Sequence, residues 1–98
     1  MLAYCELLIS HLVQVSYRMD AGDMTAGFVA RAKGIASHLC KEVHLLAREV
    51  CGGNGIILDN HVIKQFIDLQ GLHTGEGTYE VNMLVSGREL TGGLKAFK

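Results

Sequence analysis

The sequence predicts an all-α protein, an antiparallel four-helix bundle that forms a single domain over residues 1–98. Apolar residues recur at steps of three and four along most of the chain, which is the spacing of an amphipathic helix. Pro is absent, and many of the twelve Gly gather between the periodic segments. A chain of 98 residues buries one small core and no more. These observations exclude a multi-domain enzyme within this sequence.

The first helix is predicted over residues 2–19. Its polar residues Glu6, His11 or Ser10, Gln14 and Arg18 recur about every four positions and leave the rest of the circumference apolar. We therefore expect this helix to be mostly buried. Its apolar surface is broader than a small bundle can cover, so a second copy, a partner chain or further domains should cover the remainder.

The other three helices follow from the same spacing and from the turn formers between them. Turn residues at 20–23 precede a second helix whose apolar residues alternate at steps of three and four from 29 to 50, which is typical of a bundle seam. This helix stops at residues 51–55, where Gly and Asn favour a helix end. A third helix is predicted over 61–69 and a fourth over 78–90.

Composition excludes several classes of function. The formal net charge is -1 and the basic residues are scattered, so no stripe suits nucleic acid, and no apolar run approaches the roughly 20 residues that span a bilayer. Cys5, Cys40 and Cys51 are odd in number and lie in or beside helical segments, which indicates reduced thiols. No metal site is expected, because His38 and Cys40 project apart on a helix and, with His44, lack a carboxylate. Without a secretion or import signal we expect an intracellular protein, with cytoplasm, mitochondrial matrix and peroxisome left open.

Four motifs occur in an order typical of one protein family: C-G-G-N-G-I at 51–56, H-V-I-K-Q-F at 61–66, T-G-E-G-T-Y-E at 74–80 and S-G-R-E-L-T-G at 86–92. Over its whole length the chain resembles the C-terminal domain of flavin-dependent acyl-CoA dehydrogenases and oxidases. The glutaryl-CoA dehydrogenase branch and the short-chain acyl-CoA oxidases are the most similar. The N-terminal helical domain and the middle β domain of such enzymes have no counterpart here. The resemblance implies FAD as cofactor, an acyl-CoA thioester as substrate and a homo-oligomer, a tetramer in the family.

The resemblance also implies the site residues. The Glu of the E-G-T turn is the family's catalytic base, which here is Glu76, and the acyl thioester is bound at Glu76 and Gly77. Taken alone, Glu76 fits a carboxylate favoured near a helix start, and Gly52 with Gly53 fits a plain helix end. In the family, positions at both turns and at the C-terminus contact FAD, which here are Glu49, Val50, Cys51, Gly52, Gly53, Thr78, Glu80 and Phe97.

Two positions depart from the family pattern. Gly75 stands where the family usually has Tyr, and Glu80 replaces the common amide with a carboxylate that accepts hydrogen bonds but cannot donate them. The implied function is α,β-oxidation of a short-chain or glutaryl thioester, with this segment inactive in isolation. A non-catalytic truncated module acting through oligomerisation or docking is one alternative, and an oxidase using oxygen is another.

Overall fold

The computed structural model describes residues 1–93 and contains four α-helices: α1 (Leu2–Asp20), α2 (Ala26–Val50), α3 (Val62–Thr74) and α4 (Tyr79–Leu90). Two short 3₁₀ helices, η1 (Gly52–Ile56) and η2 (Leu58–Asn60), connect α2 to α3. No strand occurs in the described part of the chain. The predicted all-α class is therefore confirmed.

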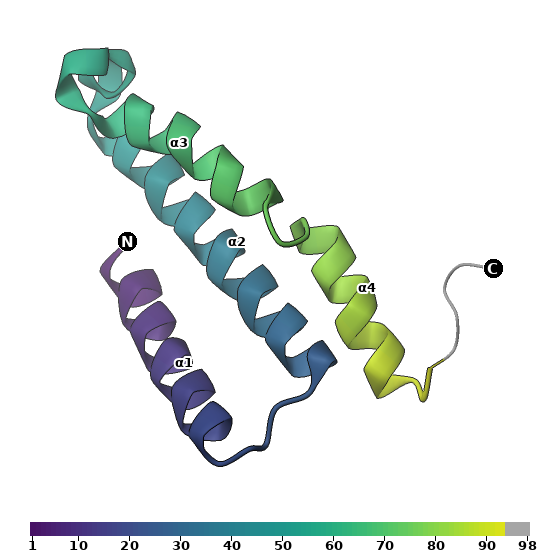
Figure 1. Cartoon of the computed structure of the whole chain (residues 1–98). Helices are drawn as coiled ribbons and strands as arrows, with labels where there is room; N and C mark the ends of the chain where they lie inside the picture. The colour runs from purple at the N-terminus through teal and green to yellow at the C-terminus, as the bar shows by residue number, and fades with distance from the viewer. Residues whose placement is uncertain (94–98) are drawn as a thin grey trace.

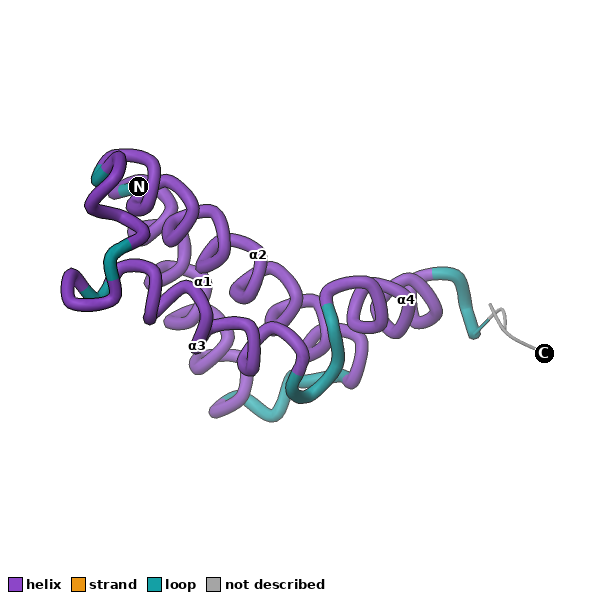
Figure 2. The backbone as a smooth tube through the Cα atoms, turned by 90° about the horizontal axis from the view of Figure 1, so that it is seen from above, coloured by secondary structure: helices purple, strands orange, loops and turns teal. Residues whose placement is uncertain are grey.

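The longest helix, α2, organises the molecule. Helix α1 runs antiparallel along one side of it, while α3 and α4 follow one another along the other (Figure 1). In the view of Figure 2, α4 continues beyond α3, past the loop that joins them. Because α3 and α4 together contain as many residues as α2, the pair spans its whole length. The four predicted helices thus form a flat arrangement, with extents of 48 × 34 × 17 Å, rather than two stacked pairs.

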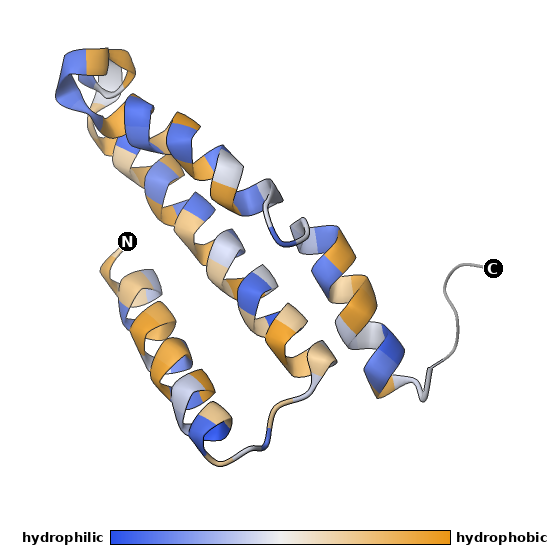
Figure 3. Cartoon of the chain, in the orientation of Figure 1, coloured by the Kyte–Doolittle hydropathy of each residue, from blue (hydrophilic) through white to orange (hydrophobic). Residues whose placement is uncertain are grey.

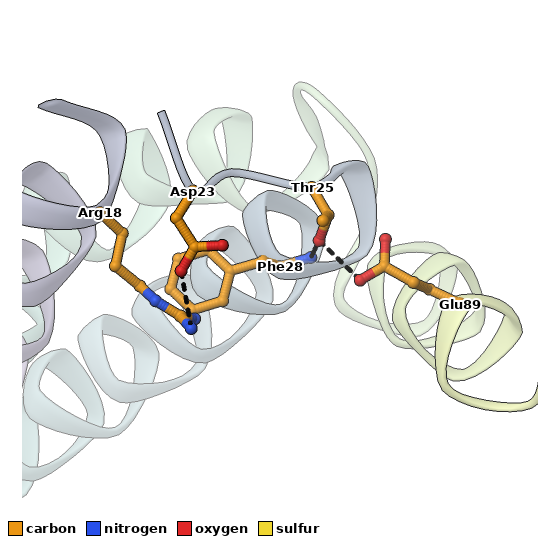
Figure 4. Close-up of polar contacts among 5 residues, drawn as sticks. All are labelled: Arg18, Asp23, Thr25, Phe28 and Glu89. Carbon is orange, nitrogen blue, oxygen red and sulfur yellow. Dashed lines mark hydrogen bonds and ion pairs between the residues drawn. The ribbon is translucent and has the colours of Figure 1, made fainter. Parts of the chain in front are cut away.

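Small residues at the start of α2 let α4 approach closely. The buried residues of this helix are Phe28 and its small neighbours Gly27, Ala30, Ala32 and Gly34. A Cβ atom at Gly34 would lie 3.5 Å from the Cβ of Asn82 and would clash with Met83 on α4. The guanidinium of Arg18 on α1 lies 4.4 Å from the Phe28 ring centroid and pairs with Asp23 at 3.2 Å (Figure 4). The core therefore sits between the first part of α2 and α4, with Arg18 of α1 over Phe28.

The prediction that the first helix is mostly buried is wrong for the single chain. No residue of α1 is buried, because α2 covers one face of it and leaves the opposite face open. Figure 3 shows this apolar helix at the edge of the molecule. Its large apolar residues with more than two-fifths of their surface exposed are Leu2, Leu7, Ile9, Leu12, Val13, Tyr17 and Met19.

Two helix details also differ from the prediction. Helix α3 continues to Thr74, past Gly71, and the side chains of Gln70 and Thr74 donate to carbonyl groups one turn earlier. Of the predicted seam on α2, both ends are exposed, Val29 at 47% and Val50 at 76%. Apolar spacing marked these ends correctly as helical but did not show that the neighbouring helices leave them uncovered.

Candidate functional site

The turn that joins α3 to α4 has an unusual backbone. Glu76 adopts a φ of 56° and Gly77 a φ of 90°, so two consecutive residues lie in the left-handed region. Glycine adopts this region readily, but a residue with a side chain does so at a cost and must be held there by its surroundings. Gly75, which precedes them, ends α3 in an extended conformation. These residues separate α3 from α4, and Glu76 lies exposed between the two helices.

Two side chains hold the carbonyl groups of this turn. The Nδ2 atom of Asn82, on α4, donates to the carbonyl oxygens of Glu76 at 3.3 Å, Gly77 at 2.8 Å and Thr78 at 3.0 Å. The Nζ atom of Lys33, on α2, donates to the carbonyl oxygens of Gly77 at 2.6 Å and His73 at 3.1 Å. The turn is thus bound by side chains from α2 and α4.

Glu76 is exposed and borders an apolar hollow. The hollow has a volume of about 500 Å³ and is lined by Ala26, Val29 and Ala30 of α2, with Lys33 and Asn82 beside them. A carboxylate next to a mostly apolar surface can act as a base on a ligand that carries an apolar chain, since the ligand would exclude water from it. The structure thus places Glu76 at this hollow, and Gly77, the other residue predicted to bind substrate, follows it in the turn.

A second, more polar cleft lies on the other side of the turn, between α2 and the α3–α4 junction. It has a volume of about 220 Å³, and its lining includes Thr78, Glu80 and Lys41. Burial, together with Lys41 and other basic neighbours, lowers the pKa of His73 in this cleft. The imidazole therefore favours its neutral form near pH 7. Thr78 and Glu80, both predicted to contact the cofactor, are brought together here.

The other predicted cofactor residues lie at the far end of α2. Glu49, Val50, Cys51, Gly52 and Gly53 are all exposed, and a Cβ atom at Gly52 or Gly53 would meet nothing within 4 Å. The turn is therefore open to an approaching ligand. Cys51 is the C-cap residue of α2, and it is exposed.

Within one chain, the two groups of residues predicted to contact the cofactor, at 49–53 and at 78–80, lie far apart. Lys33 contacts the E-G-T turn, whereas the backbone of Arg48 lies against Gly55 beside the G-G turn. These two α2 residues are fifteen positions apart, which corresponds to about 22 Å along a helix. In Figure 1 the G-G turn lies beyond the start of α3, and the E-G-T turn lies between α3 and α4. Phe97, the last predicted cofactor residue, lies outside the described residues.

The thiols and titratable side chains suggest no further reactive centre. Burial, and then the neighbouring Cys5, raises the pKa of Cys40, which makes this thiol a poorer nucleophile. In residues 1–93, no disulfide forms, and no three His, Cys, Asp or Glu side chains are grouped to hold a metal ion. Across the same residues, no helix is both long and apolar enough to cross a bilayer.

Sequence reasoning did not single out Lys33 and Asn82. Lys33 looks like any charged residue on an amphipathic helix, and nothing local connects it to a turn more than forty residues later. The sequence holds only a weak signal, which is that Asn82 and Ser86 are polar residues one turn apart on α4. The structure shows that both are buried. A buried polar side chain must find hydrogen-bond partners, and for Asn82 these are the turn carbonyls.

The chain matches a known family over most of its length. Residues 1–91 match the family model described as acyl-CoA dehydrogenase, C-terminal domain. The match covers all four α-helices and both turns that carry the predicted site residues.

Proposed function

The chain belongs to the acyl-CoA dehydrogenase family through its C-terminal domain, and from this premise we propose that it supplies the catalytic base for α,β-oxidation of an acyl-CoA thioester. The observation that carries the proposal is the position of Glu76, on a glycine-flanked turn beside an apolar hollow. We also propose that it works with further domains that bind the flavin and CoA, because one small helical layer offers too little surface to enclose both.

In the proposed reaction, Glu76 removes a proton from the α-carbon of the thioester. The acyl chain occupies the hollow beside Ala26, Val29 and Ala30, and its apolar surface excludes water from the carboxylate. A desolvated carboxylate is a stronger base than one in water. Backbone N–H groups at Glu76 and Gly77 are suited to bind the thioester carbonyl, where negative charge develops as the proton leaves.

FAD is the proposed cofactor, and the residues present fit it. The exposed turn at Gly52 and Gly53 leaves room for a ligand to approach the backbone, and Thr78 and Glu80 line a polar cleft. Glu80 only accepts hydrogen bonds, so its partner on the cofactor must be a donor such as an amino or hydroxyl group. When bound, the flavin supplies the hydride acceptor for the β-carbon.

A homo-oligomer is the proposed assembly. The separation of about 22 Å along α2 between the two cofactor sets supports contacts from one chain to two different cofactors. In such an assembly, Glu49, Val50 and Cys51 would reach the cofactor of a neighbouring subunit together with the G-G turn. Thr78 and Glu80 would contact the cofactor nearest to Glu76.

We further propose a short-chain or glutaryl thioester as the substrate, on the motif resemblance. Gly75 suits its own backbone surroundings, since a Cβ atom there would lie 3.2 Å from the carbonyl oxygen of Gly71. No aromatic side chain projects from this position toward the hollow.

The electron acceptor is either another flavoprotein or oxygen. Comparing the activity with an artificial acceptor against the release of peroxide distinguishes the two.

A second candidate function is a non-catalytic helical module that acts by oligomerisation or docking. The exposed apolar face of α1 favours it, because soluble proteins seldom leave so many large apolar side chains of one helix in water. An intact mass near 10.6 kDa in the source cells, without flavin, would support this candidate.

The decisive experiment uses the protein isolated from its source cells. We expect bound FAD and acyl-CoA-dependent reduction of an artificial electron acceptor. Glu76→Gln should keep the flavin and lose the reduction, because an amide cannot take the proton. Glu6→Gln, an exposed carboxylate on α1, is the matched control and should retain activity. Equal activity of the Glu76 variant would overturn the proposal.

A further inference from the structure

We propose that Lys33 and Asn82 are positioning residues that hold the Glu76–Gly77–Thr78 turn in the geometry that the base requires. The inference rests on the proposed function of Glu76 and adds a role that neither the motifs nor the family match assigns. Lys33 comes from α2 and Asn82 from α4, so the turn is held between two helices. We refer to these two side chains as the carbonyl clamp.

Asn82 is the buried half of the carbonyl clamp. Its residue is 7% exposed, and its single amide nitrogen faces three consecutive carbonyl oxygens at 2.8 to 3.3 Å. The chain must wrap tightly around this nitrogen to present three carbonyl groups to it. A Cβ atom at Gly77 would lie 3.0 Å from the same nitrogen, which explains why glycine suits this position.

Lys33 is the charged half of the carbonyl clamp. Its ammonium group bonds the last turn of α3 through His73 and the E-G-T turn through Gly77. Within residues 1–93, neither ion pair involves Lys33: Arg18 pairs with Asp23, and Arg48 with Glu49. Its charge is therefore directed to two neutral carbonyl groups, and a charged donor makes stronger hydrogen bonds than a neutral one.

The carbonyl clamp matters for Glu76 because the carboxylate has no anchor of its own. Within residues 1–93, the Glu76 side chain makes no hydrogen bond or ion pair, so its position follows from its backbone. That backbone lies in the left-handed region, which a residue with a side chain keeps only when its surroundings hold it there. Loss of the clamp would release Glu76 to ordinary backbone conformations that point elsewhere.

The first arm of the test measures the turn itself and does not depend on activity. Lys33→Met keeps the aliphatic stem and removes the donor, and Lys64→Met is the matched control on the exposed face of α3. We expect amide hydrogen exchange at Gly75 and Asn82, the hydrogen-bonded amides that border the turn, to speed up at least tenfold in Lys33→Met. Exchange in the middle of α2 should stay unchanged, and Lys33→Arg should restore most of the protection. Unchanged exchange at the turn would overturn the carbonyl clamp.

The second arm measures catalysis in the flavin-containing protein from its source cells. Displacement of a catalytic group by about 1 Å can cost on the order of 100-fold in rate. We therefore expect Lys33→Met and Asn82→Ala to lower kcat by about 10- to 100-fold, with KM and flavin content unchanged. If kcat falls only in proportion to a loss of flavin or to a lower Tm, both residues have a structural role only, and the positioning role is overturned. If either variant does not fold, the other decides.

The two arms separate failure of this inference from failure of the proposed function. If the wild-type protein binds no flavin and oxidises no thioester, the proposed function fails, yet hydrogen exchange still tests the carbonyl clamp. If the wild-type protein is active and exchange at the turn does not respond to Lys33→Met, the clamp fails and the assignment of Glu76 stands.

Discussion

The carboxylate of Glu89, at the end of α4, forms two hydrogen bonds with the start of α2, one of them to the side chain of Thr25. Its Oε1 atom accepts from the Thr25 hydroxyl at 2.6 Å, and its Oε2 atom accepts from the Gly27 N–H at 2.8 Å (Figure 4 shows the first). The Thr25 hydroxyl in turn accepts from the Phe28 N–H at 3.2 Å. A negative charge at a helix N-terminus is favourable, so one carboxylate joins two helices and stabilises the first turn of α2.

Loss of the Thr25 hydroxyl should destabilise the fold. Thr25→Ala removes both the helix cap and the donor to Glu89. We expect a loss of about 1 kcal/mol in the free energy of unfolding, or roughly 4–8 °C in Tm. Thr25→Ser keeps the hydroxyl and should lie near the wild type. Equal urea midpoints for the Ala and Ser variants would contradict this role.

Stability should also depend on pH through Glu89. Hydrogen bonds from Thr25 and then from Gly27 lower the pKa of Glu89 from its ordinary value of 4.5. A carboxyl group with a lowered folded-state pKa stabilises the fold above the unfolded value and loses that contribution as pH falls through the folded value. Urea unfolding at pH 6 and at pH 3 should therefore show a smaller acid effect in Glu89→Gln than in the wild type. Glu6→Gln, on the exposed side of α1, should behave like the wild type.

The G-G-N-G turn offers a sharp comparison between two glycines. A Cβ atom at Gly55 would overlap the Arg48 carbonyl group, which is backbone and cannot move aside, whereas one at Gly53 would meet nothing within 4 Å. Gly55→Ala should lower the free energy of unfolding by about 1–3 kcal/mol. Gly53→Ala should be neutral or stabilising by a few tenths of a kcal/mol, since it restricts the unfolded chain. Similar losses in both variants would refute the assigned contact.

The open face of α1 should drive association of the chain. Ile9 is 63% exposed and Leu12 53% exposed, one helical turn apart in the single chain. We expect light scattering at micromolar concentration to give a mass above 10.6 kDa, and the double variant Ile9→Lys with Leu12→Lys to lower it. Gln14→Lys adds one charge at an exposed polar position and should leave the mass unchanged. A well-folded monomeric wild type would count against an interface on this face.

Periodicity and turn residues predicted the four helices to within a few residues, because each helix follows local spacing and helix-end chemistry. They did not predict that α3 runs on to Thr74, where side-chain bonds to preceding carbonyl groups support an exposed helix end. They also missed that α3 and α4 lie in line along α2, because helix lengths and a four-residue gap permit several packings. Only the folded structure shows which faces of the helices pack against one another.

In the candidate site, too, some residues could be predicted from the sequence and others could not. The residues of both turns came from motifs, which are contiguous in sequence and can be read without a structure. The carbonyl clamp joins Lys33 to Gly77 across α2 and the α3–α4 junction, and no local pattern indicates such a contact. The hollow beside Glu76 is lined by Ala26, Val29 and Ala30 at the start of α2, and of these only Val29 belongs to the predicted seam.

The central claim is that Glu76 removes the α-proton of an acyl-CoA thioester. The most direct test incubates the flavin-containing protein with butyryl-CoA in D₂O under anaerobic conditions and measures deuterium at the α-carbon by mass spectrometry. We predict incorporation with the wild type and with Glu6→Gln, and a loss on the order of 1,000-fold or more with Glu76→Gln at equal flavin content. Incorporation by Glu76→Gln at the wild-type rate would contradict the account and assign the base to another residue.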